Sequence, residues 1–409
     1  MKYNINPRNG DKLSALGFGC MRFSGDSIVT SFSGFFDQKK VEQLVLTAIE
    51  HGINYFDTAY VYTGSEEALG NIFEKNHLRD KIYLATKMPL IICQKAEDLD
   101  KYFYRQLEHL KTDHIDYYLL HMLSDMKTWD TLCNWGIKEW VKEKKESGEI
   151  RNFGFSFHGS LNEFLALLDA YDWDFVQIQY NYSDENYQAG VTGLRAAADK
   201  GIPVMIMEPL LGGKLAKNLP KEAVERYKKE DPKLSPASWG FRWLYDQPEV
   251  TVVLSGMNAM DQLADNVRTA NLAAKKKLTP EEQAAIQDVR DIFNASYKVH
   301  CTGCHYCTPC PAGVDIPTCF AAYNTRYSIS RSQGLIQYYM GTLLSDKPSY
   351  AGLCKKCGRC EKHCPQHLPI RKDLAAVSKQ FEGPLFQATK TVMPLFMRKK
   401  PTAEDKKSK

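Results

Sequence analysis

Residues 54–62, NYFDTAYVY, contain the clearest indication of the fold. The first half of this stretch is typical of a short buried strand, because aromatic residues run up to a polar residue, Asp57. The preceding residues 39–52, KKVEQLVLTAIEHG, carry apolar residues at helical spacing and end in Gly52, a common helix stop. A helix that leads directly into a buried strand with a polar end indicates an α/β protein.

The same alternation of helix and strand recurs along the first 270 residues. Seven further apolar runs are predicted strands, and helical patterns separate them. These runs are ALGFGCMRF (15–23), IYLATK (82–87), IDYYLLH (115–121), RNFGFSF (151–157), FVQIQY (175–180), IPVMIMEP (202–209) and VTVVLSG (250–256). Strands joined by helices pair in parallel through right-handed crossovers, and eight such units can close on themselves. The sequence therefore predicts an α/β fold, a (β/α)8 TIM barrel.

Composition excludes several classes of protein. The chain has 409 residues, of which 44% are hydrophobic and 25% charged, as in an ordinary folded protein. Its longest apolar runs are too short to span a bilayer, and its N-terminus lacks the apolar core of a signal peptide. The formal net charge of +4 is dispersed and does not suggest a nucleic-acid partner. Twelve cysteines without an export signal argue against disulfides, so we expect a cytoplasmic protein.

Four polar residues follow consecutive predicted strands. Asp57 ends the second strand, Tyr62 comes five residues later, Lys87 ends the third strand and His121 ends the fourth. Because the carboxyl ends of barrel strands meet at one mouth, these side chains are expected to form one site.

This set of four suits the reduction of a carbonyl. A tyrosine can donate a proton to the carbonyl oxygen if a nearby ammonium favours the phenolate and lowers its pKa. Asp57 can pair with Lys87 and hold it in place. His121 can donate a hydrogen bond to the oxygen as charge develops there.

Several motifs resemble the aldo/keto reductases over roughly residues 10–270. These are FDTAYVYTGSEEALG, LATK, IDYYLLH, GEIRNFGFS and SGMNAMDQLADN. The resemblance implies a barrel that binds a nicotinamide dinucleotide without a Rossmann fold and reduces a small carbonyl substrate. It also implies that Tyr62 is the proton donor, with Asp57, Lys87 and His121 as its partners.

The resemblance further implies which residues read the nicotinamide carboxamide. The family usually does so with a Ser-Asn pair after strand five and a Gln on strand six. Ser156 and Gln177 fit this pattern, whereas Phe157 stands at the Asn position. Met207 replaces the Tyr that the family commonly stacks on the nicotinamide. These departures leave a bound flavin as an alternative cofactor.

The choice between NAD and NADP is also left open. The family often holds the 2′-phosphate of NADP with Lys and Arg near the last strand, and the matching positions are Gly256 and Gln262. The loss of two cations weakens the case for NADP over NAD. The full set of expected cofactor contacts is Gly19, Ser156, Gln177, Pro209, Leu210, Gly212, Ser255, Gly256, Gln262 and Asn266.

Eight of the twelve cysteines lie in two short runs, CTGCHYCTPCP from Cys301 and CKKCGRCEKHCP from Cys354. The second run matches C-x2-C-x2-C-x3-C-P, the spacing of bacterial-type [4Fe–4S] ligation. In that motif three closely spaced cysteines hold one cluster and the fourth serves the other. In the first run, Cys310 follows after two residues instead of three.

This spacing predicts two [4Fe–4S] clusters with crossed ligands. One cluster takes Cys301, Cys304, Cys307 and Cys364. The other takes Cys354, Cys357, Cys360 and Cys310. Cys319 is an alternative to Cys310, and zinc is an alternative for the whole set.

The segment between the two runs contains two helical patterns, IPTCFAAYNTRYSI and QGLIQYYMGTLL. This long helical connection resembles the α-helical ferredoxin domains of respiratory and heterodisulfide reductase subunits. The predicted organisation is a barrel over 1–285, a two-cluster ferredoxin-like domain over 286–380 and a basic tail over 381–409.

Three functions are compatible with these halves. A nicotinamide delivers two electrons as hydride, whereas a cluster passes one electron at a time. The chain is therefore a carbonyl reductase with structural, sensing or docking clusters, or an electron-transfer oxidoreductase that uses a flavin or a redox partner such as a ferredoxin, or a binding protein with a silent barrel. The four strand-end residues favour the first.

Overall fold

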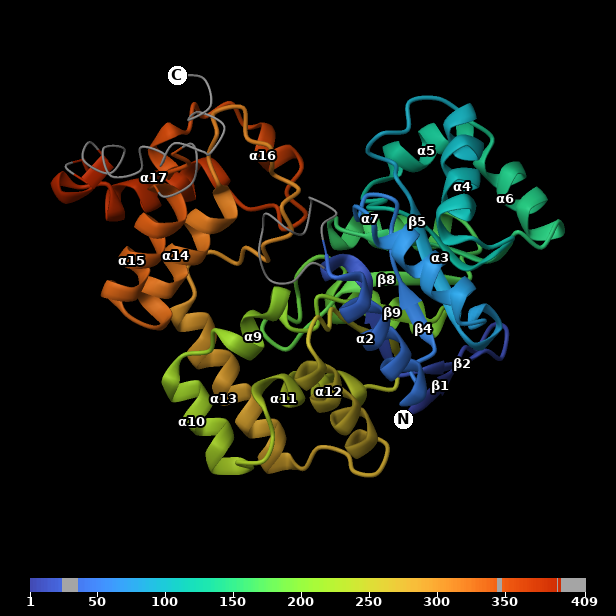
Figure 1. Cartoon of the computed structure of the whole chain (residues 1–409), viewed down its shortest axis with the longest axis horizontal. Coiled ribbons are helices and arrows are strands. Elements are labelled where there is room, and N and C mark those ends of the chain that lie inside the picture. The colour runs from blue at the N-terminus through green and yellow to red at the C-terminus, as the bar shows by residue number, and fades with distance from the viewer. Residues whose placement is uncertain (24–35, 344–347, 388, 391–409) are drawn as a thin grey trace, which may run out of the picture. The chain divides into compact units, whose positions relative to one another are not determined.

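The computed structural model describes residues 1–23, 36–343, 348–387 and 389–390. Contacts within it divide the chain into two compact units (Figure 1). The first consists of Met1–Ala216 and Arg226–Asp288, and the second of Lys217–Glu225 and the chain from Val289 onward. The predicted domain boundary at residue 285 stays a prediction, because helix α13 (Pro280–Ser296) runs through it.

Eight parallel strands close into a barrel in the first unit, which confirms the predicted fold class. In barrel order they are β3 (Leu16–Gly19), β4 (Tyr55–Asp57), β5 (Tyr83–Met88), β6 (Ile115–Leu120), β7 (Ile150–Phe157), β8 (Phe175–Gln179), β9 (Val204–Met207) and β10 (Val250–Ser255), and β10 pairs back with β3. A short antiparallel hairpin precedes them, formed by β1 (Tyr3–Ile5) and β2 (Lys12–Ser14).

Helices alternate with these strands along the chain (Figure 1). They are α2 (Gln38–Glu50), α3 (Ser65–Lys75), α4 (Glu97–Leu110), α5 (Met126–Asn134), α6 (Ile137–Glu146), α7 (Leu161–Ala170), α8 (Gly190–Asp199), α9 (Lys214–Lys217), α10 (Lys221–Glu230), α11 (Pro236–Tyr245) and α12 (Met260–Ala273). Single 3-10 turns are η1 (Cys20–Arg22), η2 (Arg79–Lys81) and η3 (Leu211–Gly213). Within the described ranges, no helix has both the length and the apolar composition that a bilayer span requires.

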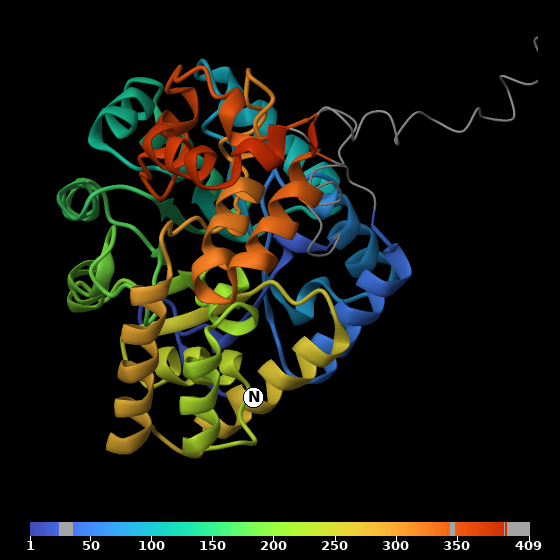
Figure 2. The same cartoon turned by 90° about the vertical axis from the view of Figure 1, so that its left-hand side faces the viewer.

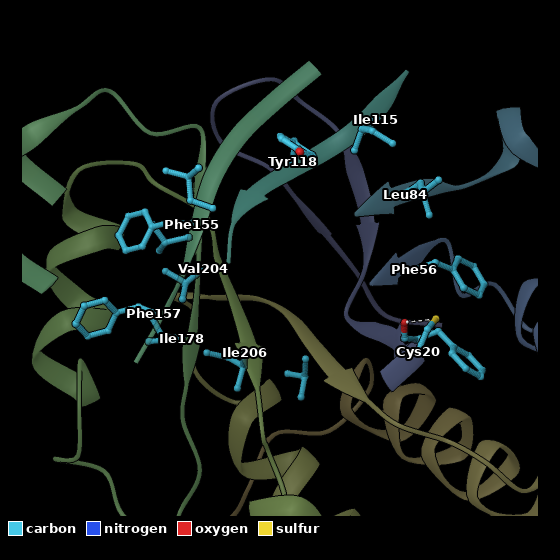
Figure 3. Close-up of a cluster of buried hydrophobic side chains, with 14 of the residues drawn as sticks. Cys20, Phe56, Leu84, Ile115, Tyr118, Phe155, Phe157, Ile178, Val204 and Ile206 are labelled. Carbon is cyan, nitrogen blue, oxygen red and sulfur yellow. Dashed lines mark hydrogen bonds between the residues drawn. The ribbon is translucent and has the colours of Figure 1, made fainter. Parts of the chain in front are cut away.

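Alternation along the strands builds two apolar layers, because successive side chains of a strand point to opposite faces. Phe56 on β4, Phe155 on β7 and Ile178 on β8 belong to the layer between strands and helices (Figure 3). Their neighbours fill the barrel interior. The interior cluster is Leu13, Tyr55, Ala85, Tyr117, Leu119, Phe175, Met205, Val252 and Leu254. Side chains thus fill the barrel interior, and a reaction site can form only at the mouth of the barrel.

Helix α13 starts at a capping box that also carries a buried ion pair. The amide of Glu282 donates to Thr279 Oγ1 at 3.2 Å, and the amide of Thr279 donates to Glu282 Oε2 at 2.9 Å. The same carboxylate accepts two hydrogen bonds from Arg242 on α11, at 2.9 and 2.8 Å. Burial raises the pKa of Glu282, but these hydrogen bonds and the charge of Arg242 outweigh it and lower the pKa to about 2.

Replacing Glu282 by Gln is expected to destabilise the barrel unit by about 3–5 kcal/mol, because it leaves a buried guanidinium without its counter-charge. A carboxylate with a lowered pKa stabilises the fold above its unfolded pKa, so the difference from wild type should persist down to about pH 4.5 and vanish as the pH approaches about 2. Urea unfolding followed by tryptophan fluorescence measures this, since all six tryptophans lie in the first unit. The exposed neighbour provides the control: Glu281→Gln should change unfolding little, and an equal loss in both variants would contradict the role of the pair.

The second unit is helical, and the two helices predicted between the cysteine runs are confirmed. They are α14 (Ile316–Ser328) and α15 (Arg331–Leu343), which lie side by side (Figures 1 and 2). They are followed by η4 (Ala351–Leu353), α16 (Arg359–Lys362) and α17 (Ile370–Phe381), and α17 packs on α14. Tyr338 stacks on Phe381 with ring centroids 4.6 Å apart and donates to Glu382 Oε1 at 2.6 Å. Most of the predicted basic tail lies outside the described residues.

Candidate active site and cysteine clusters

The alternation that fills the barrel interior also places polar side chains at its carboxyl end. Asp57 lies two residues beyond the interior Tyr55, and Lys87 lies two residues beyond Ala85. His121 has the same relation to Leu119. Residues two apart on a strand share a face, so these polar groups continue the inward-facing rows above the apolar core.

All four strand-end residues come together there. Lys87 Nζ donates to Asp57 Oδ1 and to the carbonyl oxygen of Thr58, both at 2.7 Å. The same ammonium lies 5.1 Å from the ring centroid of Tyr62. The rings of Tyr62 and His121 meet edge to face, with centroids 5.9 Å apart. The arrangement therefore holds a phenol between an ammonium and an imidazole.

Burial sets the charge of two of these groups. It lowers the pKa of His121 well below its ordinary value, and the nearby charges of Lys87 and His158 act in the same direction. His121 is therefore neutral at neutral pH. Burial also raises the pKa of Asp57, which the ammonium of Lys87 opposes. Asp57 Oδ2 is buried and has no hydrogen-bond partner among the described residues, so the carboxylate depends on Lys87 to stay charged.

A buried polar network contacts the backbone of Lys87, and the sequence prediction missed this network. Gln106 Nε2 donates to the carbonyl oxygen of Lys87 at 3.1 Å and to Glu66 Oε1 at 2.7 Å. Thr86 Oγ1 donates to the same Glu66 oxygen at 2.6 Å. Tyr118 donates to Gln106 Oε1 at 2.8 Å. Only the position of Glu66, inside the motif around Tyr62, could have pointed to this network.

His158 is a second buried imidazole that the prediction missed. It directly follows β7, its Nδ1 lies 3.2 Å from Gln188 Oε1, and it lies near enough to His121 to lower the pKa of that residue. Its position just after a strand was the available signal, because that is where the other site residues were found.

The residues expected to hold the nicotinamide carboxamide lie next to each other. Ser156 on β7 and Gln177 on β8 are paired in register, and both are buried. Ser156 Oγ accepts a hydrogen bond from the amide of Met122 at 2.9 Å. Gln177 Oε1 is buried without a hydrogen-bond partner in the described part of the chain. A buried amide oxygen without a donor is costly, so this position fits a ligand that brings an N–H group.

The two substituted positions differ in their surroundings. Phe157 belongs to the layer outside the strands, where its ring lies 4.9 Å from that of Phe164 and points away from the barrel interior (Figure 3). Met207 packs against the interior cluster at the end of β9. At this position the chain therefore has an apolar side chain instead of the Tyr expected from the family resemblance.

The other expected cofactor contacts surround the ends of β3, β9 and β10. Asn266 Nδ2 donates to Ser255 Oγ at 3.0 Å, and Gln262 Oε1 accepts from the amide of Asn258 at 3.1 Å. A Cβ on Gly19 would lie 3.4 Å from the Ser255 backbone. Gly256 is exposed, Pro209 is buried, Leu210 is half-buried and Gly212 has a φ of 66°.

The cysteines of the two runs lie in the second unit with different exposure. Cys301, Cys304, Cys307, Cys310, Cys354 and Cys360 are partly buried, Cys364 is buried and Cys357 is exposed. Burial raises the pKa of Cys307, and the neighbouring thiols of Cys301, Cys304 and Cys364 raise it further. Cys307 of the first run therefore has the last cysteine of the second run as a neighbour.

The second run shows the reciprocal arrangement. Burial raises the pKa of Cys360 to about 11, and Cys354 and Cys310 are among the neighbouring charges that add to this rise. Cys319 is not among those neighbours; it is fully buried on α14, and its Sγ lies 3.9 Å from the carbonyl oxygen of Ser349. Across the described ranges, no three His, Cys, Asp or Glu side chains form a site for a single metal ion.

Comparison with known families accounts for both halves of the chain. A model described as the aldo/keto reductase family matches residues 15–291, about two thirds of the chain. The chain belongs to the aldo/keto reductase family. In this aldo/keto reductase a second model, described as a 4Fe-4S dicluster domain, matches residues 300–369, which contain both cysteine runs. That match supports iron–sulfur clusters over the zinc alternative.

Individual relatives align with the reductase part of the chain. The oxidoreductase YrpG of Bacillus subtilis (strain 168) is 25% identical over 319 residues, which cover 68% of this chain and 94% of the relative. The NADH-specific methylglyoxal reductase of Escherichia coli (strain K12) is 23% identical, with 64% of this chain and 90% of the relative covered. The holo form of the aldo-keto reductase AKR11C1 from Bacillus halodurans has a similar fold, with a TM-score of 0.55, 24% identity, and coverage of 71% of this chain and 96% of that chain.

Proposed function

We propose that this aldo/keto reductase reduces a small carbonyl compound to an alcohol with NADH or NADPH and carries two [4Fe–4S] clusters. The observation that carries the proposal is the contact of the Lys87 ammonium with both Asp57 and the ring of Tyr62, beside the neutral ring of His121. A bound reduced nicotinamide supplies the hydride that this chemistry requires.

The side chains supply the proton and stabilise the developing charge. Tyr62 donates its phenolic proton to the carbonyl oxygen, which becomes the hydroxyl group of the alcohol product. Lys87 stabilises the phenolate that remains until Tyr62 takes a new proton from water, and Asp57 holds Lys87 in place. His121 is neutral, so it donates a hydrogen bond to the oxygen without competing as an acid.

Gln177 and Ser156 are the proposed contacts of the nicotinamide carboxamide. The buried Gln177 Oε1 accepts from the carboxamide N–H₂, and the adjacent Ser156 completes the pair. Gly256 and Gln262 offer no cation to a 2′-phosphate, which favours NADH over NADPH. The NADH-specific relative is consistent with this preference.

Replacing Gln177 by Leu is expected to weaken nicotinamide binding by about 5- to 150-fold, the range for losing one buried hydrogen bond. Fluorescence titration with NADH measures the dissociation constant directly. Gln283→Leu, an exposed change on α13, provides the control and should bind NADH as wild type does. Unchanged affinity in Gln177→Leu would contradict the assigned contact.

Anaerobically purified protein tests the proposal as a whole. We expect a brown colour, about eight iron and eight sulfide per chain as two cubane clusters require, and reduction of a carbonyl such as methylglyoxal with NADH. The absence of iron and sulfide would overturn the cluster assignment. Failure to reduce any of a panel of aldehydes and ketones in the presence of intact clusters would overturn the reductase assignment.

A second candidate is an electron-transfer oxidoreductase in which the clusters exchange electrons with the barrel site through a flavin or a partner protein. Met207 and Phe157 favour it, because both replace residues that usually contact the nicotinamide. Bleaching of the clusters by NADH alone would support this candidate, whereas carbonyl reduction without bleaching supports the first. We place either enzyme in the cytoplasm, where thiols stay reduced.

A further inference from the structure

The two cysteine runs differ in how their ligands meet the surface. Among the first group, Cys301, Cys304 and Cys307 are partly buried and Cys364 is buried. In the second group Cys357 is exposed, and it is the one exposed cysteine in the described part of the chain. An electron entering or leaving through the surface therefore has its shortest path at Cys357.

The surroundings of Cys357 are strongly basic. Four exposed cations lie within five residues of it, and we call them the basic rim. The basic rim consists of Lys355, Lys356, Arg359 and Lys362. None of these four forms an ion pair within the described ranges. Exposed cations without partners produce a local positive potential that attracts an oppositely charged surface.

Arg371 is a different kind of cation and does not belong to the rim. Its guanidinium pairs with Glu361 at 2.7 Å and lies close to the backbone of Gly358 and to Cys360. Beside this ion pair the surface is hollowed into a cavity of about 470 Å³. Its lining is Glu361, His367, Leu368, Pro369, Arg371 and Lys372.

Neutralising a cluster does not by itself explain the basic rim. A cubane held by four thiolates is anionic, so nearby cations stabilise it. The first run, however, has no Lys or Arg from Cys301 to Asp315. If ligation alone required cations, both runs would contain them. The cations lie instead in the run that contains the exposed Cys357.

We propose that the basic rim around Cys357 is the docking site of an acidic protein that carries one electron at a time. This inference rests on the proposed cluster held by Cys354, Cys357, Cys360 and Cys310. In the exchange the reduced cluster loses one electron and the docked carrier gains it, or the reverse, and no proton or bond is transferred. Complementary charge raises the association rate of such partners more than it raises their affinity.

Stopped-flow oxidation of the reduced holoenzyme tests the inference, with acidic cytochrome b5 and basic cytochrome c as probes. We expect the second-order rate constant with cytochrome b5 to fall about tenfold between 20 and 200 mM salt, because screening removes the attraction. Lys355→Glu combined with Lys356→Glu should lower the low-salt rate by about tenfold or more. Cytochrome c should show no such fall with salt and should react faster with the double variant.

A matched pair of lysines provides the control. Lys228→Glu combined with Lys229→Glu reverses two adjacent exposed charges on α10 and should leave the rate with cytochrome b5 unchanged. Benzoquinone, a small neutral oxidant, needs no docking and should oxidise all variants equally. The inference would be overturned if the rate constant with cytochrome b5 changed neither with salt nor in the rim variant. It would also be overturned if the rim variant reacted with benzoquinone as slowly as it reacts with cytochrome b5.

The experiment separates this inference from the proposed function. Iron and sulfide analysis of the same samples shows whether the clusters exist. If they are absent, the cluster assignment fails before docking is tested. If the clusters are present and the rates do not change with salt or with charge reversal, only the docking-site assignment is wrong.

Discussion

Tyr62→Phe is expected to lower kcat/KM for carbonyl reduction by about 10²- to 10⁴-fold, the range for removing a general acid. The ring, its contact with Lys87 and its packing against His121 can all persist in the variant, because only the hydroxyl is lost. Nicotinamide binding and iron content should therefore stay at wild-type values. Steady-state kinetics with methylglyoxal, or with another carbonyl that the enzyme reduces, measures kcat/KM, and iron analysis measures the iron content.

Tyr60→Phe is the matched control, since this tyrosine is two residues away in the same segment. Its ring packs on Tyr102 and His109, with centroids 5.1 and 5.8 Å apart, and not on the four strand-end residues. We expect nearly wild-type activity from it. Equal losses in the two variants would show that the segment is sensitive to any change, and full activity in Tyr62→Phe would refute the assigned proton donor.

Crossed ligation of the clusters predicts an unusual result for pairs of Cys→Ala changes. Removing Cys310 and Cys354 together deprives one cluster of two ligands and should leave the other intact, with about four iron atoms per chain. Removing Cys354 and Cys364 together deprives each cluster of one ligand and should leave fewer than about four. The proximity of Cys364 to Cys307, and of Cys310 to Cys360, is the basis for this expectation.

Sequential ligation, in which each run holds its own cluster, predicts the opposite order. The pair Cys354 and Cys364 would then spare one cluster, and the pair Cys310 and Cys354 would damage both. Iron analysis combined with electron paramagnetic resonance of the reduced protein distinguishes the two schemes. Cys319→Ala serves as the control: it should keep all the iron, and a loss would favour Cys319 as the ligand in place of Cys310.

Much of the barrel was predictable because the information is local. The run up to Asp57 is apolar on both faces, as a strand buried between a barrel interior and its helices must be, and the helix before it ends at Glu50, two residues before Gly52. The helices α14 (Ile316–Ser328) and α15 (Arg331–Leu343) were predictable for the same reason. The starting point of α13 was encoded in four consecutive residues, Thr279 to Glu282, whose side chains and amides satisfy one another.

Other parts of the site could not be predicted, because they depend on residues that are distant in the chain. Glu66 Oε1 accepts hydrogen bonds from Thr86 and Gln106, which are 20 and 40 residues away in the chain. The sequence around Glu66 does not indicate either partner. His158 lies in a strand-end position like His121, but only the closed barrel brings the two imidazoles near each other. The unpaired oxygen of Gln177 likewise becomes visible only when every neighbouring donor is known.

The sequence alone was enough to predict the alternation of helices and strands, the four polar residues at the strand ends and the two cysteine runs. Each of these features is a pattern of residue spacing along the chain, and such a pattern can be recognised before the fold is known. Only the folded structure shows the polar network of Glu66, Thr86 and Gln106, the proximity of His158 to His121 and the exposure of Cys357. Contact and burial depend on how the barrel closes and how the helices pack, and those are properties of the whole folded chain.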